Sequence, residues 1–338
     1  MDRPIIEFLN PENLEFLCGC ADYTSLIWEN KTCGFGSIEV HIPRPDKRIT
    51  HGLIIHLCRD IPEAYGIITT VTATNHETVI RASTLSRVFD WRYLQNDGFD
   101  VTLSTSGGTG KLICLCGKYG LIGDNDNDFF GKPAIFSYPD EALTVEAKTS
   151  LQSSCLELMT SVAKEGSYCF GCTVENGQIK LFAYPYTDKG HIFSISDSIV
   201  SELKYTSSCD SHRNVFGYSF GTDEDGYIYR AYPHNKSFSG TNRRMLNIGR
   251  YSQLPDAVLR EKAALLTETE SVEAKINLPY PESFALGEIV TIKNPAWDFS
   301  KKLAVTSVRE IWEDKYSCDV TFGFPQETVY RKMLRIYR

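Results

Sequence analysis

The stretch SFALGEIVTIKNPAWDFSKKLAVTSVREIWEDKYSCDVTFGF, residues 283–324, decides the fold. Its last part alternates, with apolar residues on one side and polar ones on the other: Tyr316, Cys318, Val320 and Phe322 against Ser317, Asp319 and Thr321. A period of two with one apolar face is typical of a half-buried strand. Two further runs, 288–293 and 303–312, are rich in β-branched residues, and turn residues separate the three. The stretch therefore predicts an antiparallel meander.

The bulk composition is that of an ordinary globular protein. With 338 residues the chain is long enough for two or three domains. A net charge of −8 argues against a nucleic-acid binder with a basic surface. The N-terminus has no signal-peptide pattern, and no apolar run reaches the ~20 residues of a membrane span. The 11 cysteines are therefore expected mostly as buried thiols in a reducing cytoplasm.

The N-terminal residues 1–94 are dense in predicted strands. Apolar runs that end in turn residues follow one another without the spacing of βαβ units, which favours a small barrel or sandwich. Clear examples are 23–28 and 37–42, and residues 66–74 and 78–82 predict a hairpin. A helix that contains Leu85, Val88 and Phe89, capped by Ser83 or Thr84, closes this segment.

Residues 95–195 predict a smaller α+β insert. Its first half is loop-rich, with a short strand expected at 112–115. A helix is expected from Leu151 to Val162, with Thr149 or Ser150 as its cap and Gly166 as its end. The strands 168–174 and 179–184 are then joined through Asn176-Gly177, and Asn-Gly is the strongest short hairpin signal.

Residues 196–325 return to strands, which are expected at 203–207, 214–220 and 227–232. A polar loop is expected at 235–249, and a helix begins at Pro255. The predicted fold class is mainly β with an α+β insert. In this prediction, two tube-like β-barrel domains (1–94 and 196–325) flank the smaller α+β domain (95–195), and a C-terminal tail covers 326–338.

Several segments resemble the siphovirus tail-hub family. Tyr23–Trp28 followed by Gly36–Pro43 is similar to the opening of that family, and Asn214-Val215-Phe216 to its third segment. Leu286–Val290 and Val320–Gly323 resemble its C-terminal L-G-D-I-V and V-T-F-G. The order agrees over most of the chain outside 95–148. The sequence departs from the pattern with Asp22 for Asn, Ile38 for Phe and Glu288 for Asp, which leaves the physical role of each position unchanged.

The resemblance implies a virion structural protein at the phage tail tip or baseplate hub, assembled in the host bacterial cytoplasm. Three copies would form a homotrimeric ring beneath a distal tail or tail tube protein, near a spike, fibre or tape-measure protein. Genomic DNA would pass through during ejection without specific binding. The aromatic residues expected at the subunit interface are Trp28, Phe35, Trp297 and Phe322.

Two motifs suggest ion or phosphate binding, but each lacks required residues. The glycine-rich segment 106–111 is followed by Leu112 and an expected strand, whereas a phosphate loop needs Ser or Thr and then a helix. Asp124, Asp126 and Asp128 alternate as in a calcium loop, but Phe129 stands where that loop has glycine. A turn and a solvated loop are the favoured interpretations.

Cysteine, histidine and acidic clusters give no catalytic or metal site. Cys169-x-x-Cys172 lacks a second ligand pair at zinc spacing, and the pairs Cys18/Cys20 and Cys114/Cys116 are typical of one strand face. Adjacent triad residue types at 210–212 cannot form a triad geometry. The acid pairs at 223/225 and 268/270 are interpreted as surface acids, and His56 and His191 as satisfied strand residues.

The sequence therefore predicts no enzyme, no cofactor and no metal. Two alternatives remain open: a cell-wall-degrading tail enzyme and a host-surface carbohydrate-binding β module. The chain ends about a dozen residues after its last expected strand, which leaves no room for an appended hydrolase domain. A carbohydrate module would present exposed, coplanar Trp or Tyr side chains in a groove.

Overall fold

The computed structural model describes residues 3–92, 101–121, 134–149, 154–196, 200–208, 215–222, 226–232, 245–251, 269–276, 280 and 282–323. Contacts divide the chain into two units. The first comprises Met1–Lys204 and Glu273–Pro325, and the second Tyr205–Val272 and Gln326–Arg338. None of the described helices has the length and hydropathy that a membrane span requires.

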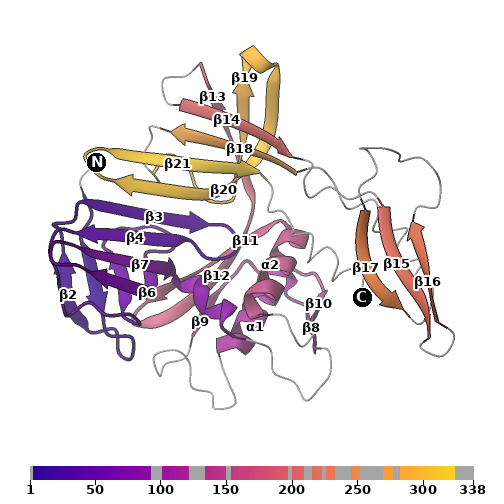
Figure 1. Ribbon diagram of the computed structural model, residues 1–338, viewed down its shortest axis with the longest axis horizontal. Coiled ribbons are helices and arrows are strands. Elements are labelled where there is room, and N and C mark those ends of the chain that lie inside the picture. Colours follow the sequence, from indigo (N-terminus) through magenta and orange to yellow (C-terminus); the bar gives the residue numbers. More distant parts are fainter. Residues whose placement is uncertain are drawn as a thin grey trace. The chain divides into compact units, whose positions relative to one another are not determined.

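A 13-stranded sheet organises the first unit (Figure 1). Its main path runs β14-β18-β21-β20-β3-β4-β7-β6-β5-β1-β2, and β13 and β19 join beside β20. The N-terminal strands are β1 (Ile6–Leu9), β2 (Phe16–Cys20), β3 (Ser25–Lys31), β4 (Ser37–Ile42), β5 (Ile54–Leu57), β6 (Tyr65–Ala73) and β7 (Thr78–Thr84). The later ones are β13 (Thr187–Ser194), β14 (Val200–Ser208), β18 (Thr269–Ile276), β19 (Glu288–Asn294), β20 (Phe299–Trp312) and β21 (Tyr316–Gly323).

The predicted meander is confirmed. Strands β19, β20 and β21 pair antiparallel in sequence order, and the 3-10 helix η3 (Pro295–Trp297) makes the first turn. In β21 the apolar residues Cys318, Val320 and Phe322 are buried, while the polar residues between them are partly exposed. The alternation in the sequence therefore corresponds to a strand with one buried face.

Strand β20 also pairs with β3, so the two ends of the chain share one sheet. The pairing is antiparallel, and Arg309 lies opposite Glu29, with Trp312 opposite Leu26. The mainly β class is confirmed. The strands near both termini, expected in separate domains, are instead continuous across this β3–β20 seam. The division at residues 94, 195 and 325 stays a prediction.

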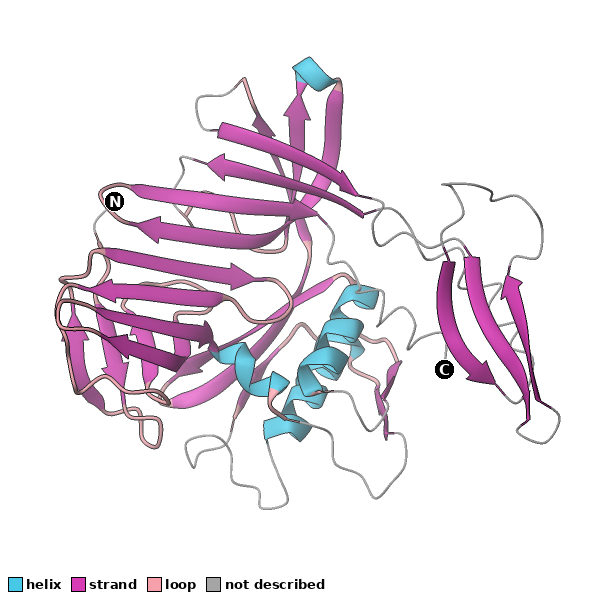
Figure 2. Ribbon diagram, viewed as in Figure 1, coloured by secondary structure: helices cyan, strands magenta, loops and turns pink. Residues whose placement is uncertain are grey.

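Within the described residues, the insert carries the α-helices α1 (Gly108–Leu121) and α2 (Cys155–Gly166). They pack on each other and on the hairpin of β11 (Tyr168–Glu175) and β12 (Gln178–Pro185) (Figure 2). Asn176 and Gly177 adopt positive φ between the two strands, which confirms the predicted turn. Strand β9 (Ile135–Ser137) pairs parallel with β12, and β8 (Val101–Thr105) pairs with β10 (Val145–Thr149).

Three local predictions, two in the insert and one just before it, were wrong. Residues 112–115 belong to helix α1 and form no strand, so Cys114 and Cys116 share a helix. Helix α2 begins later than expected, because Ser154 and Glu157 form a capping box there. Before the 3-10 helix η1 (Leu85–Asp90), the hydroxyl of Thr84 accepts from Gly36 N and does not cap the helix.

The second unit contains a three-stranded sheet of order β16-β15-β17, formed by β15 (Val215–Thr222), β16 (Gly226–Tyr232) and β17 (Met245–Tyr251). Strand β15 pairs antiparallel with β16 and parallel with β17. Residues 245–249, expected in a loop, are therefore a strand. The predicted helix from Pro255, the acid pairs at 223/225 and 268/270, the segment 210–212 and the C-terminal tail lie outside the described residues, wholly or in part.

Candidate assembly surfaces

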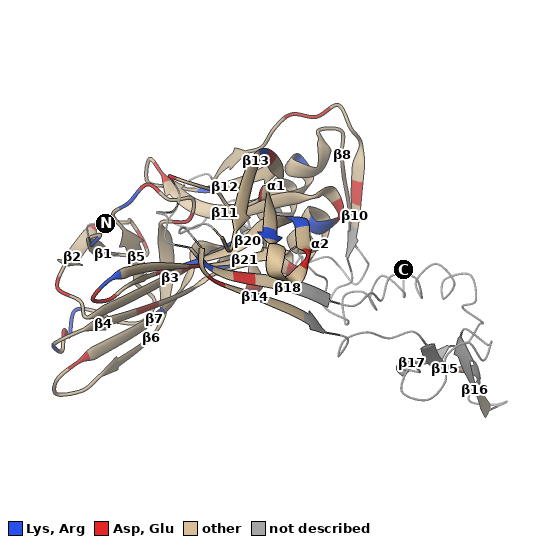
Figure 3. Ribbon diagram, turned by 90° about the horizontal axis from the view of Figure 1, so that it is seen from above, with Lys and Arg blue, Asp and Glu red and all other residues tan. Residues whose placement is uncertain are grey.

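One face of the large sheet carries both acidic and basic side chains, from strands near both ends of the chain. Strands β3, β14, β18, β20 and β21 line a hollow of about 400 Å³ on this face, which we call the charged face. Figure 3 colours the acidic and basic residues along the ribbon. Its charged residues are Glu29, Glu202, Lys204, Glu273, Lys275, Arg309 and Asp319. Acids and bases alternate, so the described part of this face has no strong excess of either sign.

An ion pair and a hydrogen bond join neighbouring strands on this side of the sheet. Lys204 Nζ lies 3.0 Å from Glu273 Oε2 between β14 and β18. Glu29 accepts from Ser307 Oγ at 3.0 Å across the β3–β20 seam. Lys204 and Glu273 are exposed, so their ion pair adds little stability, and both contacts help to fix strand register.

The charged network continues onto β4 and β7. His41 Nδ1 lies 2.7 Å from Glu77 Oε1, and its Nε2 lies 3.0 Å from Glu39 Oε1. The hydrogen bond that His41 donates to the Glu39 carboxylate raises the pKa of His41 above its ordinary value, and Glu77 acts in the same direction. Conversely, hydrogen bonds from His41 and Arg81 lower the pKa of Glu39.

Among the described strands, the main path of the large sheet ends at β2 and β14, and its branch through β19 ends at β13. On β2, Phe16 is 60% exposed and Leu17 is 44% exposed. Ile5, which precedes β1, is also exposed. An edge strand offers unpaired N–H and C=O groups, and apolar side chains along it mark a place where another chain can dock.

The four aromatic residues predicted at the subunit interface have different environments. Trp28 and Phe322 are fully buried within a single chain. This corrects the expectation that these two side chains face a neighbouring subunit. Phe35 is half-buried beneath the Arg87 guanidinium, 4.2 Å from its ring centroid. Trp297, in the β19–β20 turn, is 53% exposed and is free to contact a partner.

Two buried acids connect the chain's distant parts. Glu310 on β20 is paired with Arg59 from the loop after β5, and it accepts from the Tyr316 hydroxyl at 2.8 Å. Burial raises the pKa of Glu310 although Arg59 opposes the shift. Glu63 accepts from Ser86 Oγ and from Cys172 N at 3.0 Å, and burial raises its pKa to about 7.

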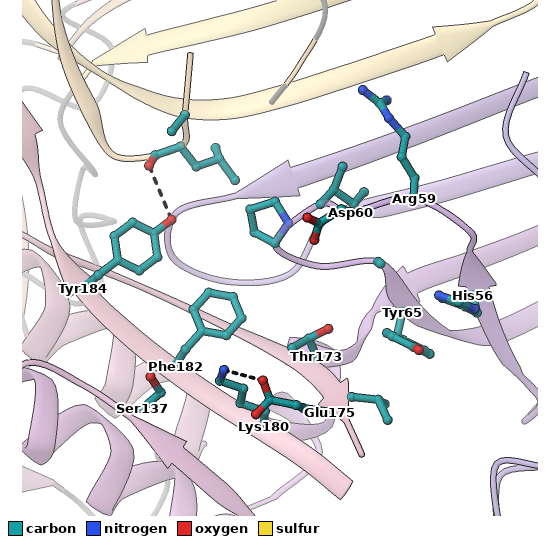
Figure 4. Close-up of a pocket in the computed structure, with 16 residues that line it drawn as sticks. His56, Arg59, Asp60, Tyr65, Ser137, Thr173, Glu175, Lys180, Phe182 and Tyr184 are labelled. Carbon is teal, nitrogen blue, oxygen red and sulfur yellow. Dashed lines mark hydrogen bonds and ion pairs between the residues drawn. The ribbon is translucent and has the colours of Figure 1, made fainter. Parts of the chain in front are cut away.

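A pocket of about 720 Å³ lies between the loop after β5 and the insert hairpin (Figure 4). Most of its charges have partners within the chain. Lys180 Nζ is 2.9 Å from Glu175 Oε1, and the Arg59 guanidinium is directed toward the C-terminal strands and pairs with Glu310. Tyr184 donates from its hydroxyl to Leu286 O at 3.4 Å. The described lining thus favours packing between segments over chemistry on a substrate.

The glycine-rich segment is a site of close internal packing. The strand expected after this segment is absent, because helix α1 follows it directly. The prediction of a strand at 112–115 was therefore wrong as an argument against a phosphate loop. The N-terminus of α1 is instead occupied by the Glu141 carboxylate, which accepts from Thr109 N at 3.3 Å and from the Tyr168 hydroxyl. A Cβ on Gly108 would lie 2.2 Å from that carboxylate.

The remaining predicted motifs that lie within the described residues are buried or contact other residues of the chain. Cys169 and Cys172 are fully buried on β11, and burial raises the pKa of both thiols. His191 contacts the buried carboxylate of Glu288. Asp124–Asp128 lie outside the described residues. A cluster that the sequence analysis missed joins Glu7, His56 and Cys58, because Glu7 lies far from the other two in sequence.

Comparisons with known proteins identify the fold. The 43 kDa tail protein of prophage MuSo2 from Shewanella oneidensis has a TM-score of 0.56 at 10% identity, covering 95% of this chain and 98% of that one. Prophage tail protein gp18 from Listeria monocytogenes has a TM-score of 0.55 at 10% sequence identity, covering 99% of this chain and 98% of that one. A chain of the p2 virion baseplate in its activated conformation has a TM-score of 0.51 at 11% sequence identity, covering 96% of this chain and 100% of that one.

No family model and no curated protein sequence matches the chain. At such low identity, the structural similarity concerns the fold alone. It extends over nearly the whole length of each of these chains. This protein therefore has the fold of phage tail proteins, as the resemblance in its sequence motifs predicted.

Proposed function

We propose that this protein is a structural component of a phage tail tip or baseplate, where it acts as a hub. The observation that carries the proposal is the end-to-end similarity to phage tail proteins, with 95–99% of this chain covered. The order of the tail-hub sequence motifs supports it independently. A fold alone does not fix a function, and the proposal rests on these two observations together.

In this proposal three copies close into a ring. The described main path of the large sheet ends at β2 and β14, its branch ends at β13, and the β2 end bears exposed Phe16 and Leu17. A closed ring removes free edges, since every edge then has a partner. A permanent interface of this kind buries on the order of 2,000 Å² or more. Trp297 and Phe35 remain candidate contacts between subunits.

The ring would sit beneath a distal tail or tail tube protein and above or beside a spike, fibre or tape-measure protein. The charged face suits a surface along which DNA moves without being held, because its described acids and bases are balanced. Tight, non-specific DNA binding requires a cluster of basic side chains. The protein would then act in the virion, and DNA would pass it during ejection.

The proposed role involves no catalysis. In the described pocket, Lys180 is paired with Glu175 and Arg59 with Glu310, so these charges stabilise the chain itself. Negative-stain images of the purified protein test the proposal, and three-fold rings are the expected result. Release of soluble fragments from purified cell wall would instead favour a tail-associated hydrolase.

A further inference from the structure

Glu7, His56 and Cys58 gather on the outer face of the N-terminal part of the large sheet. Their carboxylate, imidazole and thiol atoms all lie within 4.8 Å of one another. His56 Nδ1 is 2.9 Å from Glu7 Oε2 and 3.9 Å from Cys58 Sγ. Three different metal-binding groups therefore converge on one point.

The backbone holds these groups in a fixed arrangement. Glu7 on β1 lies directly opposite His56 on β5. Cys58 follows two residues later, and its N donates to Ile5 O at 2.9 Å, which continues the same pairing. Because residues two apart in a strand share a face, Cys58 and His56 point to the same side. All three groups thus come from two hydrogen-bonded strands.

Neighbouring strands orient the cluster and leave space beside it. Tyr65 on β6 lies opposite His56, and the two rings stack with centroids 4.1 Å apart and planes 7° from parallel. This stacking fixes the plane of the imidazole. On the other side, Gly19 of β2 lies opposite Glu7 and contributes no side chain. Gly19 itself therefore does not cover the cluster, although the Phe16 ring lies 3.6 Å from where a Gly19 Cβ would be.

We propose that Glu7, His56 and Cys58 bind a zinc-class divalent cation, with water as the fourth ligand. Zinc takes thiolate, imidazole and carboxylate ligands at about 2.0–2.3 Å, which places tetrahedral ligand atoms roughly 3.3–3.8 Å apart. The two distances from His56 Nδ1 lie on either side of that range. A thiolate together with an imidazole excludes a calcium or magnesium preference. Cys58 is exposed, so the ion would enter from solvent.

The proposal does not depend on a role in a phage tail, because the site lies within one chain. It is distinguished from an ordinary Glu7–His56 ion pair by the thiol. If Cys58 took no part in the site, replacing it would leave the binding of a divalent cation unchanged. Binding through Cys58 also releases a proton, because the thiol must ionise to bind the ion.

Cobalt and zinc titrations of the metal-free full-length chain test the site. We expect one equivalent of Co²⁺ to bind, with a thiolate-to-cobalt absorption band that Zn²⁺ displaces. Cys58→Ser should abolish the band. His56→Gln and Glu7→Gln should weaken zinc affinity by more than the roughly 10- to 100-fold cost of losing an outer-shell partner.

Cys20→Ser is the matched control, because Cys20 lies on neighbouring β2 outside the cluster. It should leave binding intact. The proposal is overturned if the wild-type chain binds no Co²⁺ or if the band persists in Cys58→Ser. Loss of the band in Cys20→Ser would also overturn it. Far-UV circular dichroism melts of the metal-free variants show whether each is folded, and the exposed Cys58 makes its serine variant the decisive one.

Discussion

Glu63 is buried where the N-terminal sheet, η1 and the insert meet. It accepts from Ser86 Oγ on η1 and from Cys172 N on β11, while its own carbonyl accepts from Trp28 Nε1 at 3.1 Å. One residue, through its carboxylate and its backbone carbonyl, therefore connects three segments that lie far apart in sequence. Its second carboxylate oxygen has no hydrogen-bond partner, which is costly for a charged group.

Replacing Glu63 by glutamine should change how stability depends on pH. Burial raises the pKa of Glu63 from 4.5 to about 7, so folding favours the protonated form. The stability that this preference contributes is fully present below pH 4.5. As pH rises to about 7, the free energy of unfolding falls by roughly 3 kcal/mol. Urea unfolding at several pH values should show that the stability of Glu63→Gln increases relative to that of the wild-type protein between pH 4.5 and about 7. Parallel curves would contradict the assignment.

Removing Arg59 should destabilise the protein strongly. Arg59→Met would leave Glu310 buried without its cation, and breaking a buried pair costs about 3–5 kcal/mol. Adding Glu310→Gln should restore part of the loss. Arg48→Met is the matched control, because Arg48 pairs with Asp46 on the surface and its loss should change stability far less. Equal losses in Arg59→Met and Arg48→Met would exclude a special role for the buried pair.

At the level of single residues, the sequence revealed alternation but not pairing. It correctly placed Val320 and Phe322 on the apolar face of a strand. It placed Trp28 and Phe322 at a subunit interface, although both belong to the core. Aromatic residues suit cores and interfaces equally, so residue type alone does not separate them.

At the scale of elements, the turn between β3 and β4 depends on a glycine. A Cβ on Gly36 would lie 1.6 Å from Glu29 O in the backbone of β3. Gly36→Ala should therefore cost at least the roughly 1–3 kcal/mol of an overpacked core. Gly19→Ala is the control, since its nearest new contact would be 3.5 Å, and it should stay within about 0.5 kcal/mol of the wild-type protein. Chemical unfolding of both variants decides the matter, and equal stabilities would contradict the close approach.

Elements with a strong local signal were predictable, whereas uniformly buried ones were not. The hairpin through Asn176-Gly177 follows from its turn residues. Helix α1 was missed because Leu112, Ile113, Cys114 and Cys116 are all buried, which hides the helical period. The start of α2 was misplaced because the Ser154–Glu157 capping box was overlooked.

At the scale of the whole molecule, the pairings that bring distant segments together could not be read from local patterns. The β3–β20 seam and the parallel pairing of β13 with β19 join residues far apart in sequence. Periodicity predicts that a strand forms but not which strand it pairs with. The tail-hub resemblance supplied the fold, while the seam and the Glu7–His56–Cys58 cluster emerged only from the structure.

The proposed ring should be sensitive to charge at its exposed apolar positions. Phe16→Glu on edge strand β2 and Trp297→Glu on η3 should each shift the protein from trimer toward monomer. Because both side chains are more than half exposed in one chain, the melting temperature of the separated monomer should hardly change. Analytical ultracentrifugation at several concentrations measures the shift. Unchanged assembly in both variants would exclude these positions from the interface.

The mass of the purified wild-type protein in solution, measured by multi-angle light scattering, tests the central claim most directly. A hub that closes as a ring of three should have three times the 38.1 kDa of one chain. A mass of one chain that persists across concentrations would contradict the account, because the open ends of the large sheet would then need no partner.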